Sequence, residues 1–255
     1  MSSHVMFLLF VGIAAYAQNL TGFALALILL GLVGATDLVP LTDAVNAVTV
    51  TALTNAATFL YRRWPVRFDR SLWPAVVSSI PGAVAGTIVM TWLAGAAYEI
   101  LRLLLGLSIV LCALLLWWAG TPLKTASSRR AFAFAGGLSG LLGGMFAAAG
   151  PPLVYLMYRQ PLPHARIQES LIAFFGVTSL MRLAVTLSAG TFSTNAVALA
   201  AEAIPVVFGV TLIAAGRPPP LSPSLLRALV CLLLVLTGAG LTGAAVSAMA
   251  AAAAQ

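Results

Sequence analysis

The chain has 255 residues, of which 61% are hydrophobic and only 7% are charged, with a formal net charge of +7. A soluble globular domain usually carries about 25% charged residues, so this composition excludes an ordinary water-soluble protein. Apolar stretches that could cross about 30 Å of hydrocarbon as helices, which takes roughly 20 residues each, recur along the whole chain. The composition predicts an all-α, polytopic membrane protein whose main partner is the lipid bilayer.

The positive net charge does not indicate nucleic-acid binding. The basic residues gather in short connections between apolar stretches, around positions 62–70 and 124–130. Such clusters are typical of cytoplasmic loops, which carry an excess of Lys and Arg. Cys112 and Cys231 each lie inside an apolar stretch, and no metal-ligand spacing is present. We therefore expect no disulfide framework, metal site or cofactor.

Eight apolar segments follow one another along the chain. They cover approximately residues 5–34, 41–61, 71–94, 99–119, 130–158, 165–189, 193–215 and 223–250. The run Arg217-Pro218-Pro219-Pro220 separates the last two, because consecutive prolines cannot continue a helix. The first and fifth segments have about 30 residues each, some 45 Å of helix at about 1.5 Å per residue. Both are longer than one crossing requires.

The two halves of the sequence resemble each other. Four matches occur in order at offsets of 121 to 125 residues: Pro40–Ala44 with Pro161–Ala165, Gly22 with Gly143, Ile80–Thr87 with Ile204–Thr211, and Leu101-Arg102 with Leu226-Arg227. Self-similarity of this kind is the signature of an internal repeat. It predicts a first membrane repeat over residues 1–122 and a second over 123–255, which together form one transport domain.

The distribution of charge favours inverted repeats. If all eight segments cross the membrane, five of the 13 Lys and Arg residues fall on the outer side. If the first and fifth segments enter and return on the same side, only Arg102 and Arg182 fall on the outer side. The excess of basic residues inside therefore predicts two inverted repeats, each of three transmembrane helices plus one broken or re-entrant segment. The alternative is eight full crossings, with the long segments tilted or kinked.

The first long segment contains a polar interruption at Gln18, Asn19, Thr21 and Gly22. Non-helical backbone at membrane depth is tolerated only where protein buries it or where it lines a water-filled cavity. Polar side chains in hydrocarbon need partners, and a transported solute can be one. We expect these four residues to contribute to a substrate-binding site.

The fifth segment contains Gly143 and Gly144, followed by Gly150 and Pro151-Pro152, and these residues are expected to break it. A helix that starts at Pro151 would present free backbone N–H groups and a positive dipole end, which attract anions. Gly143, Gly144, Gly150 and Pro151 are therefore expected to bind substrate. For the preceding glycines, Gly136 to Gly140, close helix packing through small residues is an equally good interpretation.

Three further polar residues within apolar segments are candidates. Asn55 lies deep in the second segment, where it is expected to line the substrate path. Arg182 and Glu202 lie on consecutive segments, at similar distances from the turn between them. Ionisable residues inside a membrane are functional candidates by default. These two residues are interpreted either as a structural ion pair or as groups that couple transport.

Three stretches carry a resemblance to a known family: Gln18–Phe23, Gly140–Pro152 and Ile80–Gly86. In order and spacing they resemble the TauE/SafE family of sulfite-exporter-type permeases, over nearly the whole chain. The resemblance implies a permease of the plasma or inner membrane for small anions, often sulfite or organosulfonates. The sequence departs from the family where its first glycine-rich run is reduced to Gly22, and where Ala147 and Ala149 replace glycine. The departures leave the substrate open.

The function predicted from the sequence is secondary transport of a small anion (sulfite, an organosulfonate or a related carboxylate), in the direction of export and by alternating access. An enzyme is not expected, because no nucleophile with a base, no paired catalytic carboxylates and no phosphate-binding loop are present. The alternative is a non-transporting membrane subunit or assembly factor. A homodimer is left open.

Overall fold

The computed structural model describes residues 2–65, 68–118, 123–148, 150–215 and 223–253. Within these ranges the chain is entirely helical and has no strand, as the composition predicts. The elements are α1 (Ser2–Thr21), α2 (Leu25–Thr36), α3 (Leu41–Arg62), η1 (Arg70–Leu72), α4 (Trp73–Ala96), α5 (Tyr98–Trp118), α6 (Arg129–Phe146), α7 (Pro151–Tyr158), α8 (His164–Ser188), α9 (Thr194–Ala215) and α10 (Pro223–Ala253).

Six of the described helices are long and apolar enough to cross a membrane: α1, α4, α5, α8, α9 and α10. Helix α3 is of similar length, but its threonines and asparagines make it more polar. Most of these polar residues are buried inside the bundle, so α3 presents them to its neighbours and not to lipid.

Each predicted segment has a counterpart in the structure. The second, third, fourth, sixth, seventh and eighth segments are single helices, whereas the first is α1 followed by α2 and the fifth is α6 followed by α7. Both long segments are therefore broken, as predicted. The connection Arg217–Pro220, Arg67 and Ala149 lie outside the described residues.

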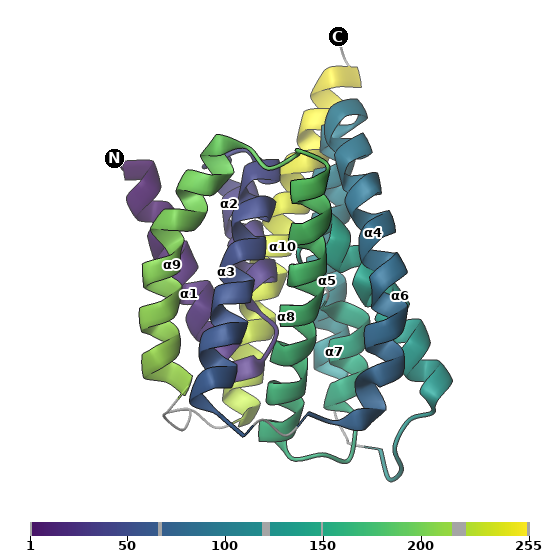
Figure 1. Ribbon diagram of the computed structural model, residues 1–255. Coiled ribbons are helices and arrows are strands. Elements are labelled where there is room, and N and C mark those ends of the chain that lie inside the picture. Colours follow the sequence, from purple (N-terminus) through teal and green to yellow (C-terminus); the bar gives the residue numbers. More distant parts are fainter. Residues whose placement is uncertain (1, 66–67, 119–122, 149, 216–222, 254–255) are drawn as a thin grey trace.

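The broken segments return toward the end of the bundle from which they started (Figure 1). Helix α1 descends from the end marked N, and α2 rises back to it; α6 rises from the opposite end, and α7 descends again. Contacts at the helix ends agree with this path. Arg102, in the first turns of α5, binds the carbonyl of Gly34 near the end of α2, and the Tyr158 hydroxyl at the end of α7 binds the carbonyl of Thr21.

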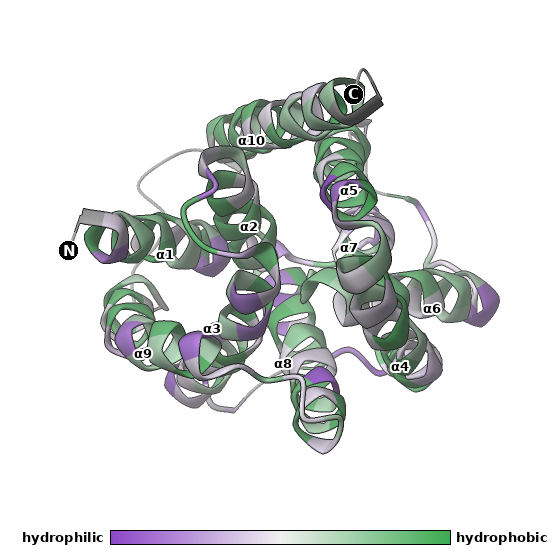
Figure 2. Ribbon diagram, turned by 90° about the horizontal axis from the view of Figure 1, so that it is seen from above, coloured by the Kyte–Doolittle hydropathy of each residue, from purple (hydrophilic) through white to green (hydrophobic). Residues whose placement is uncertain are grey.

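Helix packing follows the same pattern in the two halves. Helix α1 packs on α9 as α6 packs on α4, and α2 packs on α10 as α7 packs on α5. Helices α3 and α8 lie side by side (Figure 2), with α3 also against α9 and α8 also against α4. The helices that flank the two breaks, α1 with α2 and α6 with α7, are thus packed against helices of both halves.

The contact between α4 and α6 depends on small residues. Gly136, Gly140 and Gly144 recur every four residues on α6 and face backbone atoms of α4. A Cβ at Gly140 would lie 2.3 Å from the carbonyl oxygen of Ser79, and one at Gly144 would lie 2.1 Å from that of Ala83. Small residues let two membrane helices approach this closely. The packing interpretation is confirmed for Gly136 and Gly140, and it extends to Gly144.

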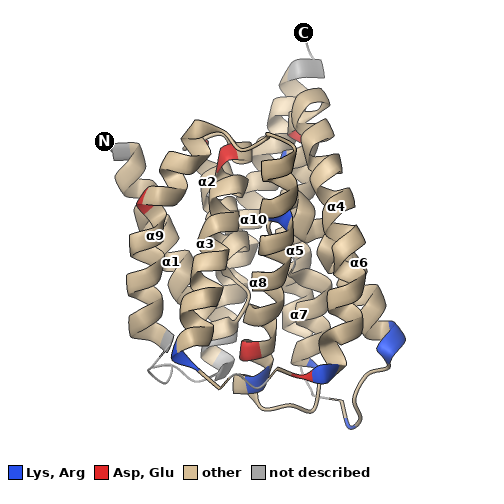
Figure 3. Cartoon of the chain, viewed as in Figure 1, with Lys and Arg blue, Asp and Glu red and all other residues tan. Residues whose placement is uncertain are grey.

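Charged residues divide between the two ends of the bundle (Figure 3). Most described Lys and Arg residues lie at the end where α3, α5 and α7 finish, which we call the basic end: Arg62, Arg63, Arg70, Lys124, Arg129, Arg130, Arg159 and Arg166. Asp37, Asp43 and Glu99 lie at the opposite, acidic end. Arg102 and Arg182 are the described exceptions, since they lie toward the acidic end.

Candidate functional site

The first break lies between α1 and α2 and turns at Gly22. The φ angle of Gly22 is +90°, a conformation that glycine adopts at no steric cost. The Gln18 side chain supports the turn, because its Oε1 accepts a hydrogen bond of 2.9 Å from the backbone N–H of Leu25. The Thr21 hydroxyl donates to the carbonyl of Ala17 at 2.8 Å. Gln18 and Thr21 thus satisfy the backbone around the break.

Residues of the second half hold the tip of this break. The side-chain amide of Gln168, one turn into α8, donates a hydrogen bond to the carbonyl of Asn19. The Tyr158 hydroxyl donates to the carbonyl of Thr21 at 2.8 Å, and the Tyr158 ring packs edge-to-face on Phe23. Carbonyls at the end of a helix have no intrahelical partner. These side-chain hydrogen bonds therefore take the place of the backbone hydrogen bonds that the break removes from Asn19 and Thr21.

The second break begins after Phe146, later than predicted. Gly143 and Gly144 lie inside α6, and Ala147 takes the left-handed conformation that ends the helix, with φ of 53°. The backbone N–H of Ala147 donates to the carbonyl of Gly143 at 2.8 Å. The expectation that the Gly143-Gly144 pair itself breaks the segment is wrong, because close contact with α4 keeps this part of α6 helical.

Helix α7 starts at Pro151, as expected, but its first turn offers no free N–H to an anion. Pro151 and Pro152 have no backbone N–H. The N–H of Leu153 donates to the Ser139 hydroxyl at 3.0 Å, and that of Val154 donates to the carbonyl of Gly150 at 2.9 Å. The N–H groups of Leu153 and Val154 are therefore engaged within the protein, and substrate binding at Gly150 and Pro151 stays a prediction, for which the positive end of the helix dipole is the remaining support.

The two breaks meet inside the bundle. A cavity of about 10 Å³, room for about one water molecule, is lined by Gln18, Phe23, Leu25 and Ala26 from the first break, Ala147 and Ala148 from the second, and Ala52 and Phe175. Ala52 and Phe175 lie near the middle of α3 and α8. Among the predicted site residues, Gln18 lines this cavity directly.

Asn19 and Asn55 form a separate buried cluster with Thr211 of α9. The Nδ2 of Asn19 lies 3.1 Å and that of Asn55 2.8 Å from the Thr211 hydroxyl. All three residues are at most 3% exposed, and the Oδ1 atoms of both asparagines are buried without a hydrogen-bond partner among the described residues. Two orphaned acceptors in one cluster leave room for a donor or a water molecule.

We expect Thr211→Val to lower both the stability and the transport rate. The change keeps the shape but removes the acceptor shared by two buried amides, and each unsatisfied group costs about 1–3 kcal/mol. Thermal unfolding and flux in proteoliposomes measure the two effects. Thr237→Val is the matched control, because the Thr237 hydroxyl is also buried but donates only within its own helix, to Leu233 at 2.9 Å. Equal effects of the two changes would contradict a role for the cluster.

Arg182 occupies the centre of a second polar cluster and is completely buried. Its Nε donates to the carbonyl of Gly144 at 2.9 Å, and its Nη1 donates to Asn46 Oδ1 at 3.1 Å and to Thr49 Oγ1 at 2.7 Å. The Nη2 atom has only the Met90 sulfur, at 3.6 Å, which is a weak acceptor. Among the described residues no carboxylate pairs with this guanidinium.

The predicted pair between Arg182 and Glu202 is not formed. Glu202 lies on an exposed face of α9, where its carboxylate contacts Nδ1 of His4 at 2.8 Å. Arg182 instead points into the bundle, toward α3, α4 and α6. The other buried arginine, Arg102, differs in that it lies 3.0 Å from a carboxylate oxygen of Asp37.

A cleft of about 190 Å³ leads from the acidic end toward Arg182. It is lined by Thr42, Asn46, Met90, Thr91, Ala94, Thr186 and Thr191. Asn46 and Met90 also contact the guanidinium, so Arg182 lies directly below the floor of the cleft. The lining combines hydroxyl and amide groups with apolar surface, which suits a small polar solute.

Several residues of these clusters were not predicted from the sequence. Thr211, Thr49 and Gln168 lie in apolar segments and carry no charge, so they were not distinguished from ordinary helix residues. Asn46, Thr49 and Asn55 do leave a trace, because each is a polar residue within a segment predicted to lie in the membrane.

Comparison with known proteins agrees with the geometry. Residues 7–241 match the family model described as sulfite exporter TauE/SafE. The chain is 34% identical over 241 residues, 93% of each chain, to the probable sulfite/organosulfonate exporter TauE of Cupriavidus necator. It is 30% identical over 191 residues, 69% of this chain and 75% of the relative, to the probable inner membrane transporter protein TsaS of Comamonas testosteroni. No solved structure matches significantly. The chain therefore belongs to the TauE/SafE sulfite exporter family, and it is a multi-pass transporter of the inner membrane and not an enzyme.

Proposed function

We propose that the protein is a secondary transporter that exports a small anion, such as sulfite, an organosulfonate or a related carboxylate, by alternating access. The relative from Cupriavidus necator, a probable sulfite/organosulfonate exporter, supports these substrates and this direction, and the relative from Comamonas testosteroni supports membrane transport in general. The observation that carries the proposal is Arg182, a fully buried guanidinium without a carboxylate partner in the described part of the chain. A charge in a membrane protein is costly unless something pairs with it, and a transported anion would do so.

The proposed layout is two inverted repeats, residues 1–122 and 123–255, that act as one transport domain. The opposite courses of α1–α2 and α6–α7 support it (Figure 1). It is also supported by the packing of the broken segments, since α1 and α2 pack on helices α9 and α10 as α6 and α7 pack on α4 and α5. In transporters of this design, broken helices meet near the midplane and the two halves rock around the bound substrate. One chain suffices for this mechanism, and a homodimer is not part of the proposal.

The basic end is proposed to face the cytoplasm, because cytoplasmic loops of membrane proteins carry the excess of Lys and Arg. The cleft above Arg182 then opens outward. The cavity between the two breaks is much smaller, about 10 Å³ against about 190 Å³. This difference fits a conformation in which the outer path is more open than the connection between the breaks.

The predicted site residues then divide between binding and shaping. The Arg182 guanidinium binds the anion, and Gln18, Asn19 and Asn55 line the path with amide groups. Thr21, Gly22, Gly143, Gly150 and Pro151 shape the two breaks, while Gly144 supplies a carbonyl that positions Arg182. Glu202 is left outside the path, since it lies on the exposed side of α9.

Flux measurements on the purified protein in liposomes test the proposal. Radiolabelled sulfite, one organosulfonate and acetate are each loaded inside, and their efflux is compared with that from protein-free liposomes. We expect efflux of at least one of them to be saturable and to depend on the protein. Absence of flux for every anion, with a protein that still unfolds cooperatively, would contradict the proposal and favour a non-transporting membrane subunit.

A further inference from the structure

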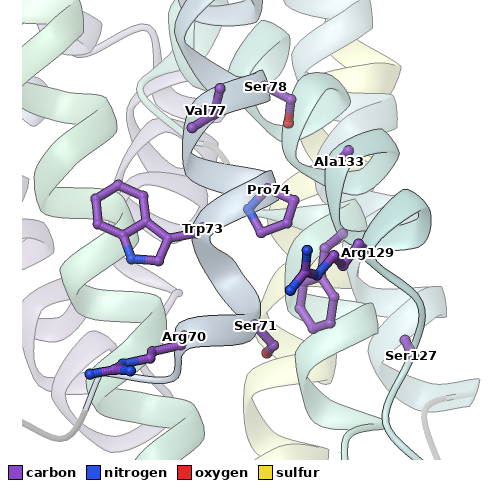
Figure 4. Close-up of a pocket in the computed structure, with 10 residues that line it drawn as sticks. Arg70, Ser71, Trp73, Pro74, Val77, Ser78, Ser127, Arg129 and Ala133 are labelled. Carbon is purple, nitrogen blue, oxygen red and sulfur yellow. The ribbon is translucent and has the colours of Figure 1, made fainter.

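A further cavity lies outside the proposed transport path, at the basic end. It is an open groove of about 840 Å³ between the first turns of α4 and α6. Its lining comes from η1 and α4 on one side and from α6 and the preceding residues on the other, and includes Arg70, Trp73, Val77, Ser127, Arg129 and Phe132. Figure 4 shows Arg129 directed toward Pro74, whereas Arg70 lies below Trp73 at the opposite edge and extends away from Arg129.

The groove has positive charges without partners in the described chain. Neither Arg70 nor Arg129 forms a salt bridge with a described carboxylate. The nearby Asp69 carboxylate is engaged by the backbone N–H of Ser71 at 2.8 Å. Both arginine side chains belong to exposed residues, so an anion can reach them. Arginine suits phosphate because its planar guanidinium can donate two hydrogen bonds to one oxyanion.

An apolar stripe continues from the groove into the membrane-facing surface of α4. Its exposed residues follow helical spacing along one face: Trp73, Val77, Ile80, Val84 and Ile88. Trp73 is 58% exposed at the start of α4, the depth at which tryptophans of membrane proteins meet the lipid headgroups. A charged groove that opens onto such a stripe matches a molecule with an anionic head and a hydrocarbon tail.

Hydrogen bonds fix the side of the groove that is formed by α6 and the residues before it. The backbone N–H of Ser127 donates to Gln160 Oε1 at 2.9 Å, and Gln160 Nε2 donates to the Ser127 hydroxyl at 2.8 Å. The Ser128 side chain caps the first turn of α6 by accepting from the N–H of Ala131. These contacts hold Arg129 in place beside α4, so the groove exists before a ligand binds.

We propose that this groove binds one anionic phospholipid from the leaflet at the basic end. The phosphate contacts Arg129, Arg70 adds positive potential from the opposite edge, and one acyl chain follows the apolar stripe of α4. Basic pockets between membrane helices are suited to such headgroups. This inference rests on the groove alone and stands whether or not the proposed transport path is right.

Lipid binding to the detergent-solubilised protein tests the proposal by native mass spectrometry and thermal unfolding. The probes are dioleoyl phosphatidylglycerol, dioleoyl phosphatidylcholine and inorganic phosphate. We expect the first bound phosphatidylglycerol to have at least a fivefold lower dissociation constant than phosphatidylcholine. Arg70→Gln/Arg129→Gln should remove this preference, since one basic residue near an anionic lipid surface contributes about a fivefold factor. Arg130→Gln, the neighbouring exposed arginine outside the groove lining, is the matched control and should retain the preference.

Three results of the lipid comparison would overturn the proposal. They are equal affinity for the two lipids in the wild type, an unchanged preference in the double variant, and an equal loss of preference in Arg130→Gln. Stabilisation by inorganic phosphate alone to the same extent as by phosphatidylglycerol would also overturn it, in favour of a soluble phosphate ligand. Unfolding temperatures in phosphatidylcholine alone show whether the double variant is folded, which we expect because both side chains are exposed.

Discussion

Replacement of Arg182 by glutamine is expected to reduce anion flux at least about thirtyfold per folded molecule. Loss of one partner from a buried charge interaction costs about 2–5 kcal/mol, and each 1.4 kcal/mol is a factor of ten. Arg182→Lys keeps the charge but loses the planar arrangement of donors that reaches Gly144, Asn46 and Thr49 together. It should retain residual flux with a raised KM. Initial efflux rates from proteoliposomes, normalised to reconstituted protein, measure both effects.

The control for this prediction is Arg102→Gln. Arg102 is also buried and lies toward the acidic end, but Asp37 neutralises it. This variant should keep most of its flux, even if its unfolding temperature falls. Wild-type flux in Arg182→Gln would contradict the placement of the anion at Arg182. An equal loss in the two arginine variants would indicate a structural effect common to both.

The second large effect concerns the contact between α4 and α6. We expect Gly140→Ala to lower the unfolding temperature by about 2–12 °C, because overpacking costs about 1–3 kcal/mol and each kcal/mol shifts Tm by about 2–4 °C for a chain of this size. The new Cβ would lie 2.3 Å from the Ser79 carbonyl oxygen and 2.6 Å from its Cα. Both are backbone atoms, so relief requires separation of the helices.

Gly137→Ala provides the comparison on the same helix. A Cβ there would meet its nearest atom, the Ser78 carbonyl oxygen, at 3.8 Å, which is an ordinary contact. We expect its unfolding temperature to stay within about 2 °C of the wild type, since helix propensity slightly favours alanine over glycine. If both alanine variants unfold at the same temperature, the close approach of α4 and α6 does not limit stability.

The sequence predicts most of the helical layout because length and hydropathy constrain it strongly. The two segments of about 30 residues that contain polar or Gly-Pro interruptions are broken in the structure, whereas α10, with 31 residues, is one continuous helix. The positions of the breaks are predicted less well. Gly143 and Gly144 indicate flexibility in isolation, but both lie inside α6, where Gly144 packs closely against Ala83 of α4.

The polar contacts depend on how distant segments come together, which the sequence does not specify. Arg182 and Glu202 are of opposite charge and at similar depths, yet their side chains leave α8 and α9 in different directions. Thr211 acquires its role only because α9 packs against both α1 and α3, where it meets Asn19 and Asn55. Composition alone cannot distinguish this threonine from those that bond only to their own helix.

The support of the first break by the second half has a consequence for biogenesis. The carbonyls of Asn19 and Thr21 receive their hydrogen bonds from Gln168 and Tyr158, which are synthesised about 140 residues later. Until α7 and α8 have entered the membrane, the tip of α1 must remain hydrated or be shielded by the insertion machinery, because unpaired backbone groups are not tolerated in lipid. Expressed alone, residues 1–122 should therefore be a substrate for quality-control proteolysis, and simultaneous synthesis of residues 123–255 as a separate chain should protect them.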